Sequence, residues 1–298
     1  MQRGCNFFIH QKNTVKEMKI AVIGIGLIGG SMMLKLKGKN FISKAIGIDK
    51  NDHHLKEALD LKIIDEKADL EEGIQNADLV IVATPVSATK TLLPKVLDNI
   101  SSHQTVMDVG STKQEIAEAV KEHPNRHRYV AFHPMWGTEN SGPSAAKVDS
   151  FSGKAAVICD AHLSDNDALK TVEDIANQLE MNLLYMTSEA HDIHTAYISH
   201  ISHITSYALA NTVLEKEREE DTIFQLASSG FSSTVRLAKS HPEMWVPIFK
   251  QNKENVLDVL NEHISQLRKF KAALEKENYD LLEELIRNAN KIRGILDQ

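Results

Sequence analysis

The first half of the chain alternates between short apolar runs and segments with helical spacing. The runs are rich in Val, Ile and Leu and lie at 19–24, 45–49, 79–84, 105–110, 129–132, 155–160 and 183–187. Near-continuous apolar strands are typical of a parallel sheet that is buried on both faces. Their alternation with helices indicates βαβ units. The pattern therefore predicts an α/β domain with a doubly wound parallel sheet over residues 18–187.

The pattern changes after about residue 188, where strand-like runs stop. A helix is expected from Glu189 to about Lys216, and two apolar stripes follow at helical spacing. The stripes consist of Val256, Leu260, Ile264 and Leu267, and of Leu281, Leu285, Ala289 and Ile292. Residues 188–298 are therefore predicted to form an all-helical domain. Residues 1–17 precede a second methionine, Met18, and are set apart as an N-terminal tail, native or a product of start-codon choice.

Composition narrows the class of protein. A chain of 298 residues suggests about two domains. The net charge of −7 disfavours a nucleic-acid or anionic-membrane partner. Two distant cysteines, Cys5 and Cys159, form neither a disulfide scaffold nor a zinc site, so a reducing cytoplasm is the expected location. No apolar run approaches the roughly 20 residues of a membrane span.

A glycine-rich turn directly follows the first predicted strand. It reads Gly24-Ile25-Gly26-Leu27-Ile28-Gly29 and precedes a helical stretch. This is the strand–turn–helix context of the dinucleotide fingerprint. Asp49 ends the second strand, where a carboxylate can bind the ribose hydroxyls and would repel a 2′-phosphate. The domain is therefore predicted to be of Rossmann type and to bind NAD through this turn and Asp49. Lys50 leaves use of NADP open, and a glycine turn without a cofactor is the alternative.

Polar clusters follow two later strands. Ser111 lies in the sequence DVGSTK, and His133 lies in FHPMWGTE. Ligands of open α/β sheets bind outside the carboxyl ends of the strands. A histidine there can act as a general base near neutral pH, and Ser111 can bind the same substrate oxygen or orient the imidazole. Taken alone, a histidine before Pro134 is more often a turn residue.

Five ordered motifs resemble the prephenate dehydrogenases of tyrosine biosynthesis. They are GIGLIGGS, DVGSTK, HPMWGTENSG, HDIHTAYISHISH and SSGFSSTVRLAKSHPEMW, and they extend from about Met18 to Trp245. The resemblance implies that Ser111 and His133 are catalytic, that Glu139 lies at the active-site entrance, and that His191, His203 and Arg236 bind substrate. Trp136 stands at a position that is often small in relatives, which puts the shape of the pocket wall in doubt.

The helix expected after residue 188 carries His191, His194, His200 and His203. On an ideal α-helix the pair His191 and His194 falls opposite the pair His200 and His203, since nine residues advance the helix by about 180°. One helix of this kind cannot gather all four around one ion, so no metal site is predicted. Ordinary packing accounts for His194 and His200.

The residues and the resemblance together predict an NAD-dependent prephenate dehydrogenase with prephenate as its small-molecule substrate. An arginine fork suits a carboxylate, although a lone arginine of this kind is more often a solvated surface residue. The motif context, and with it the resemblance, favours a substrate role for Arg236. The alternatives are an arogenate dehydrogenase, a β-hydroxyacid dehydrogenase of similar architecture, and a cofactor-binding regulator without catalysis. The apolar stripes pack either within the chain or across a twofold axis, and the resemblance favours a homodimer.

Overall fold

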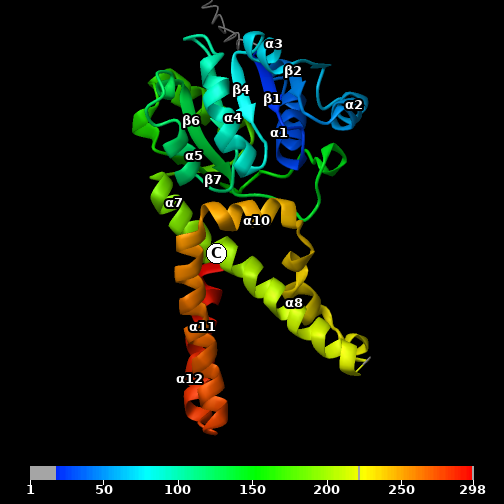
Figure 1. The fold of residues 1–298 in the computed structure, drawn as a ribbon, viewed down its shortest axis with the longest axis vertical. Coiled ribbons are helices and arrows are strands. Elements are labelled where there is room, and N and C mark those ends of the chain that lie inside the picture. The colour runs from blue at the N-terminus through cyan, green and yellow to red at the C-terminus, as the bar shows by residue number, and fades with distance from the viewer. Residues whose placement is uncertain (1–17, 221, 297–298) are drawn as a thin grey trace, which may run out of the picture. The chain divides into compact units, whose positions relative to one another are not determined.

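The computed structural model describes residues 18–220 and 222–296, and the tail predicted over residues 1–17 lies outside them. The chain divides into two compact units, with the boundary after Ser188 (Figure 1). The first unit contains one eight-stranded sheet. Its strands are β1 (Met18–Ile23), β2 (Ile42–Ile48), β3 (Glu66–Lys67), β4 (Leu79–Val82), β5 (Thr105–Asp108), β6 (Tyr129–Pro134), β7 (Ala155–Cys159) and β8 (Asn182–Met186).

The sheet has the strand order β3-β2-β1-β4-β5-β6-β7-β8. The first six strands are parallel and form the expected doubly wound core, in which the order reverses between β1 and β4. Helices cover the sheet (Figure 1). They are α1 (Leu27–Gly38), α2 (Asp52–Asp60), α3 (Leu70–Gln75), α4 (Val86–Asp98), α5 (Gln114–Ala119) and α6 (Asn166–Gln178), with 3-10 turns η1 (Arg126–Arg128), η2 (Pro143–Ala145) and η3 (Ala161–Leu163).

The doubly wound parallel sheet is confirmed, with one pair that departs from the parallel pattern, because β7 runs antiparallel to β6. A parallel pair needs a crossover, usually a helix. The segment from 135 to 154 contains only the three-residue turn η2, whereas α6 connects β7 to β8 and makes that pair parallel. The short strand β3 was also not expected, since its two residues, Glu66 and Lys67, carry no apolar pattern.

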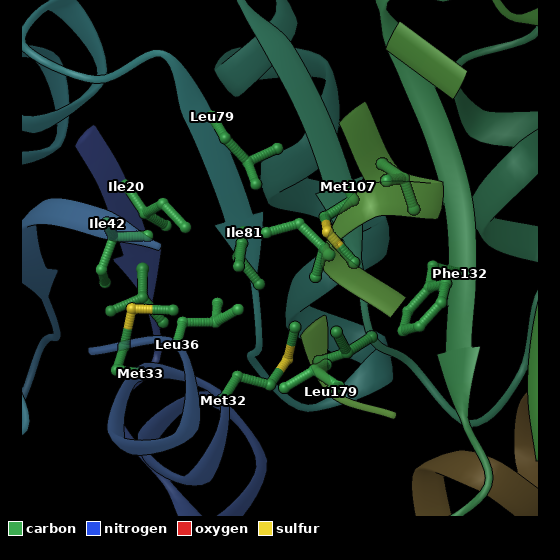
Figure 2. Close-up of a cluster of buried hydrophobic side chains, with 14 of the residues drawn as sticks. Ile20, Met32, Met33, Leu36, Ile42, Leu79, Ile81, Met107, Phe132 and Leu179 are labelled. Carbon is green, nitrogen blue, oxygen red and sulfur yellow. The ribbon is translucent and has the colours of Figure 1, made fainter. Parts of the chain in front are cut away.

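The core of the first unit lies between the sheet and its helices. Ile20 of β1, Ile81 of β4 and Phe132 of β6 have no exposed surface. Met32, Met33 and Leu36 of α1 pack against this face of the sheet (Figure 2). Strands buried on both faces explain why the sequence shows continuous apolar runs there instead of alternation.

The second unit is helical throughout its described residues. Its elements are α7 (Ser188–Thr195), the π turn η4 (Ala196–His200), α8 (Ile201–Glu220), η5 (Ile223–Leu226), α9 (Ser229–Thr234), η6 (Arg236–Lys239), α10 (Pro242–Gln251), α11 (Lys253–Glu275), α12 (Tyr279–Ala289), η7 (Asn290–Ile292) and α13 (Arg293–Leu296). The helix expected from Glu189 is thus interrupted by a π turn. Helix α12 folds back along α11 (Figure 1).

Several apolar side chains of the predicted stripes remain exposed on the helical unit. Val256 is buried, but Leu267 on α11 is 55% exposed and Ile292 is 51% exposed. The single chain therefore covers these stripes only in part. Within residues 18–220 and 222–296, no helix combines the length and the apolar character that crossing a membrane requires.

Candidate active site

The glycine turn between β1 and α1 has a backbone that side chains would disrupt. Gly24 has φ of +92°, and a Cβ there would lie 2.7 Å from the carbonyl oxygen of Ala83. A Cβ on Gly29 would lie 2.6 Å from the carbonyl oxygen of Gly24. A Cβ on Gly26, by contrast, would meet no atom within 4 Å. Gly24 and Gly29 thus serve the turn itself, while Gly26 keeps the backbone approachable from outside.

Asp49 follows β2 and is hydrogen-bonded to the glycine turn. The backbone N–H of Ile25 donates to Asp49 Oδ2 at 2.9 Å, and the N–H of Asn51 donates to Asp49 Oδ1 at 2.9 Å. The side chain is 11% exposed, and His54 Nδ1 lies 3.7 Å from Oδ2. Its two backbone hydrogen bonds therefore fix the carboxylate beside the turn, as a ribose-binding acid requires.

The residues present fit a dinucleotide. Helix α1 begins at Leu27, with Gly26 as its N-cap, and has neither a side-chain cap nor an acidic residue in its first turn. Its first N–H groups and the positive end of its dipole therefore suit a pyrophosphate. Leu27 is buried and Ile28 is half-buried, so these two residues anchor the helix start in the core.

Ser111 and His133 lie at the same edge of the sheet. In the parallel pair of β5 and β6, Asp108 aligns with Ala131. His133 lies two residues further along β6, opposite Val157 of β7, and Ser111 follows β5 by three residues. Both side chains are half-buried. The two predicted catalytic residues thus come from neighbouring carboxyl ends of the sheet, as their motifs indicated.

A buried ion pair closes the loop that carries Ser111. Lys113 Nζ lies 2.5 Å from Asp108 Oδ2, and neither side chain is exposed. The N–H of Gly110 donates to the same oxygen at 2.8 Å, and the hydroxyl of Tyr129 donates to Asp108 Oδ1 at 2.6 Å. Burial, followed by the Asp108 charge, raises the pKa of Tyr129 well above its usual value. The motif DVGSTK did not indicate this network, although Asp108 and Lys113 flank Ser111 in it.

The loop after β6 holds Glu139. Glu139 is half-buried and follows Trp136, whose ring meets the buried ring of Phe151 edge to face at 5.2 Å. Trp136 therefore packs against the core of this unit and anchors the start of the loop. The sequence left open how the large side chain of Trp136 affects the wall of the pocket. In the structure this side chain packs into the interior of the first unit.

In the helical unit, His203 of α8 is 9% exposed. Its Nδ1 lies 3.0 Å from the carbonyl oxygen of Ser199, so Nδ1 carries a proton and donates it to this hydrogen bond. In the neutral ring, Nε2 is then the unprotonated nitrogen. The ring of Trp245 from α10 stacks on the imidazole at 3.4 Å between centroids. His203 thus has a fixed ring plane and a fixed tautomer.

Arg236 begins η6 and is exposed. The hydroxyl of Ser206 donates to the carbonyl oxygen of Thr234 at 3.1 Å, which fastens the segment before Arg236 to α8 one turn after His203. Burial lowers the pKa of His203 from its usual 6.5, and the Arg236 charge lowers it further. The second unit therefore brings His203 and Arg236 together, as their shared predicted role requires.

His191 lies in the interior of the same unit. It is 1% exposed, and its Nδ1 lies 2.7 Å from Asp192 Oδ1. Its predicted contact with substrate stays a prediction. His194 is exposed, contrary to the packing role expected for it, whereas His200 is buried.

The expectation that His191 and His200 lie on opposite sides of one helix is wrong. The π turn η4 begins after His191 and ends at His200, and a π turn takes more residues than an α turn, which shifts the position of His200 around the helix axis. His191 and His203 both lie near enough to His200 to lower its pKa. Across residues 18–220 and 222–296, no group of three or more His, Cys, Asp or Glu side chains is arranged to hold a metal ion.

Comparison with known proteins matches both units. Residues 32–185 match the nucleotide-binding domain of prephenate dehydrogenase, and residues 187–288 match its dimerization domain. Prephenate dehydrogenase of Bacillus subtilis is 32% identical over 94% of this chain and 76% of its own length. Prephenate dehydrogenase of Aquifex aeolicus, solved with hydroxyphenyl propionate and NAD+, is 29% identical with a TM-score of 0.86, covering 95% of this chain and 99% of that one.

A third similar structure is the arogenate dehydrogenase of Synechocystis. It is 25% identical with a TM-score of 0.75, covering 93% of this chain and 99% of that one. The expected two-part architecture is confirmed by the two matched domains, and NAD is the nucleotide in the Aquifex aeolicus structure. From the order of its motifs, its sheet and these matches, the chain belongs to the prephenate dehydrogenase family.

Proposed function

We propose that this protein is an NAD-dependent prephenate dehydrogenase that converts prephenate to 4-hydroxyphenylpyruvate and carbon dioxide. The observation that carries the proposal is the placement of Ser111 and His133 on neighbouring strand ends of a sheet whose glycine turn and Asp49 fit a dinucleotide. Ligands of such sheets bind along this edge. The similarity to the Bacillus subtilis and Aquifex aeolicus enzymes supports the choice of substrate.

In this proposal His133 is the general base. Its imidazole accepts the proton of the hydroxyl at C4 of the substrate ring, and Ser111 hydrogen-bonds the same oxygen. NAD, when bound, supplies the acceptor for the hydride that leaves C4. Loss of the ring carboxylate as carbon dioxide then makes the ring aromatic. Because aromatisation is strongly downhill, the protein's task is mainly to orient the substrate and to take up the proton.

The substrate's charge requires placed cations, since the chain carries a net charge of −7. Arg236 binds one substrate carboxylate through its planar guanidinium, and His203 contributes a second polar contact. Glu139 takes the place at the entrance that the resemblance assigns to it. The fastening of the Arg236 segment to α8 near His203 supports this pairing.

Asp49 favours NAD over NADP. A carboxylate fixed beside the glycine turn binds ribose hydroxyls and repels a 2′-phosphate. Lys50, which is exposed, adds a nearby positive charge that softens the repulsion. A preference for NAD in kcat/KM, narrowed by Asp49→Asn, is the expected result.

Arogenate is the second candidate substrate, because the Synechocystis relative is an arogenate dehydrogenase. Arogenate carries an amino acid side chain where prephenate carries a pyruvyl group, and the ring chemistry is the same. The decisive experiment measures turnover of NAD with each substrate in parallel. Faster turnover of prephenate supports the proposal, faster turnover of arogenate replaces the substrate, and turnover of neither overturns the function.

The protein is also proposed to work as a homodimer. Residues 187–288 match the family's dimerization domain, and Leu267, Leu274 and Ile286 expose about half of their surface in the single chain. Burial of such apolar surface against a second copy is favourable. Sedimentation at micromolar concentration should give a particle of about twice the 33.3 kDa of one chain, and a 33.3 kDa particle would contradict the dimer.

A further inference from the structure

The π turn η4 lies directly before His203 and is held by side chains from elsewhere in the helical unit. Within the turn, hydrogen bonds span five residues, as in the bond from the N–H of Ile201 to the carbonyl oxygen of Ala196. Such turns are rare and often occur at functional sites. A change from α to π spacing leaves carbonyl groups without their usual partner, so other donors must reach them.

Side chains donate to carbonyl oxygens just before and within the turn. The carbonyl oxygen of Asp192, before the turn, accepts from Asn252 Nδ2 at 2.7 Å and from the hydroxyl of Thr195 at 3.2 Å. The carbonyl oxygen of Ser199, inside the turn, accepts from Nδ1 of His203 at 3.0 Å. The contact that fixes the tautomer of His203 is therefore itself made to the π turn.

Asn252 connects His200, which ends the turn, with Asp192, which lies before the turn. It lies between α10 and α11, is 3% exposed, and its Nδ2 also lies 3.1 Å from Nδ1 of His200, the last residue of the turn. One amide group thus donates to Asp192 and to His200, while its oxygen accepts from Asn255 Nδ2 at 2.7 Å. Every polar atom of this buried amide is used, so the geometry is tightly specified.

His200 connects the Asn252 amide, through the ring of Trp245, to the proposed binding residue His203. Because Nδ1 accepts from Asn252, the neutral ring carries its proton on Nε2. The His200 ring meets Trp245 edge to face at 5.9 Å, and Trp245 stacks on His203. Asn252, His200, Trp245 and His203 form one contiguous chain of contacts, which runs from the junction of α10 and α11 through η4 and α10 to α8.

We propose that Asn252 and His200 are positioning residues, which hold the π turn and with it the imidazole of His203 in the orientation that binds substrate. The inference rests on the substrate-binding role proposed above for His203. Neither residue needs to touch the substrate. Their effect should appear in substrate binding and leave the bond-breaking step and the cofactor largely unchanged.

The first test compares Asn252→Ala with Thr205→Val. Thr205 of α8 hydrogen-bonds His263 of α11 at 3.2 Å, so the control removes another contact between the helices without altering the turn. Asn252→Ala should raise KM for the better substrate by about tenfold or more, with kcat within about threefold and the Kd of NAD unchanged. Thr205→Val should lower the melting temperature and leave KM within about twofold. Equal KM values in both folded variants would overturn the proposal.

The second test needs no Asn252 variant, in case that change prevents folding. His200→Gln keeps an acceptor for the Asn252 amide, whereas His200→Leu removes it. The glutamine variant should keep KM near that of the unchanged protein, and the leucine variant should raise it by about tenfold. A purely space-filling role for His200 predicts no advantage for glutamine, and that result would contradict the inference.

The third test does not depend on turnover. Nitrogen-15 NMR of His203 should show a protonated Nδ1 and an unprotonated Nε2 in the unchanged protein, and a mixture of the two tautomers in Asn252→Ala. Unaltered His203 ring signals in Asn252→Ala would contradict the inference, whatever the activity of that variant. Absence of turnover with both substrates, together with the expected NMR change, would instead remove the proposed function and leave the positioning role standing.

Discussion

The two units differ most in what they bury. The first unit buries apolar side chains such as Ile20, Ile81 and Phe132, which pack between a sheet and its helices (Figure 2). The helical unit buries His191, His200, His203 and Asn252 around the π turn, while most of the exposed large apolar side chains of the described residues also lie in this unit. The first unit thus has a large apolar core beside its buried Asp108–Lys113 pair, whereas the buried side chains around the π turn of the helical unit are held by specific hydrogen bonds.

This difference separates two tasks. An apolar core is non-directional, so it supports a rigid sheet and leaves chemistry to polar side chains at its edge. A polar interior tolerates little change, because an unpaired buried donor or acceptor costs about 1–3 kcal/mol. We expect the first unit to carry the chemical step and the cofactor, and the helical unit to carry recognition of the substrate.

The substitution with the largest expected effect is His133→Asn, which tests whether the first unit carries the chemical step. Asparagine has a similar size and no basic imidazole, so kcat should fall by about 10²-fold or more while the Kd of NAD stays unchanged. The fall of kcat/KM on the acidic side of the pH profile should also disappear, since protonated His133 no longer limits the rate. Stopped-flow turnover measures kcat and kcat/KM, and fluorescence titration measures the Kd of NAD. A variant with nearly unchanged kcat would place the base elsewhere.

The matching change in the helical unit is Arg236→Ala. Loss of a charge-assisted pair that bound substrate desolvates costs about 2–5 kcal/mol, or on the order of 10²-fold or more in kcat/KM. Arg236→Lys should recover only part of this, because a point charge does not replace the planar fork. The Kd of NAD should not change, which is the contrast with the cofactor-binding turn.

Lys239→Ala is the control for Arg236→Ala, because Lys239 is an exposed cation on the same short turn, η6. Its removal should leave KM within about twofold of the unchanged protein. A KM that responds to Lys239 and not to Arg236 would move the carboxylate anchor to Lys239.

The sequence predicted the first unit better than the helical unit, because an apolar core leaves a visible pattern in the sequence and buried polar contacts do not. Burial on both faces makes the strands visible as continuous apolar runs, and the glycine turn and Asp49 have fixed spacing. The reversal of β7 was not predictable from apolar pattern, because it depends on the missing crossover helix between β6 and β7. The strand β3 is too short to show a pattern.

In the helical unit, helices and stripes were predictable but the polar interior was not. Periodicity of 3.6 residues places His191 and His200 on opposite sides, and only the π turn brings them toward each other. Asn252 lies 52 residues from His200, and nothing in its local sequence indicates that contact. The resemblance to the family predicted substrate-binding roles for His203 and Arg236, whereas the contacts around them became visible only in the structure.

Gly29→Ala tests whether the glycine turn of the first unit binds the cofactor independently of the helical unit. The new Cβ would lie 2.6 Å from a backbone oxygen of the glycine turn, so the turn must shift. NAD should bind about tenfold more weakly or worse, with substrate recognition by the helical unit unaffected. Gly38→Ala in the same helix is the control, since its Cβ meets nothing within 4 Å. Equal NAD affinities in the two variants would show that the close packing at Gly29 is unimportant for the cofactor.

The smallest expected effect concerns acid stability, and it also separates the units. Burial lowers the pKa of His200 from 6.5 to about 4, with Asp192 opposing and His191 and His203 adding to the shift. Its contribution to folding is complete above about pH 6.5 and is lost as the pH falls toward about 4, because the unfolded chain takes up the proton first. Burial lowers the pKa of His203 in the same direction.

The first unit should lose stability at lower pH. Hydrogen bonds from Lys39, Ser152 and Lys35 lower the pKa of Glu180 from 4.5 to about 2, so its contribution is complete above about pH 4.5 and is lost as the pH falls toward about 2.

The two tryptophans, Trp136 and Trp245, make this difference measurable, because one lies in each unit. Trp136→Phe leaves a reporter in the helical unit, and Trp245→Phe leaves one in the first unit. Between about pH 7 and about pH 5, the urea midpoint reported by Trp245 should fall while the midpoint reported by Trp136 holds nearly constant. His200→Gln, added to the Trp136→Phe chain, should reduce the fall of the urea midpoint, because glutamine does not titrate and only the contribution of His203 is left. Equal losses at both reporters would mean that the polar interior of the helical unit brings no acid sensitivity of its own.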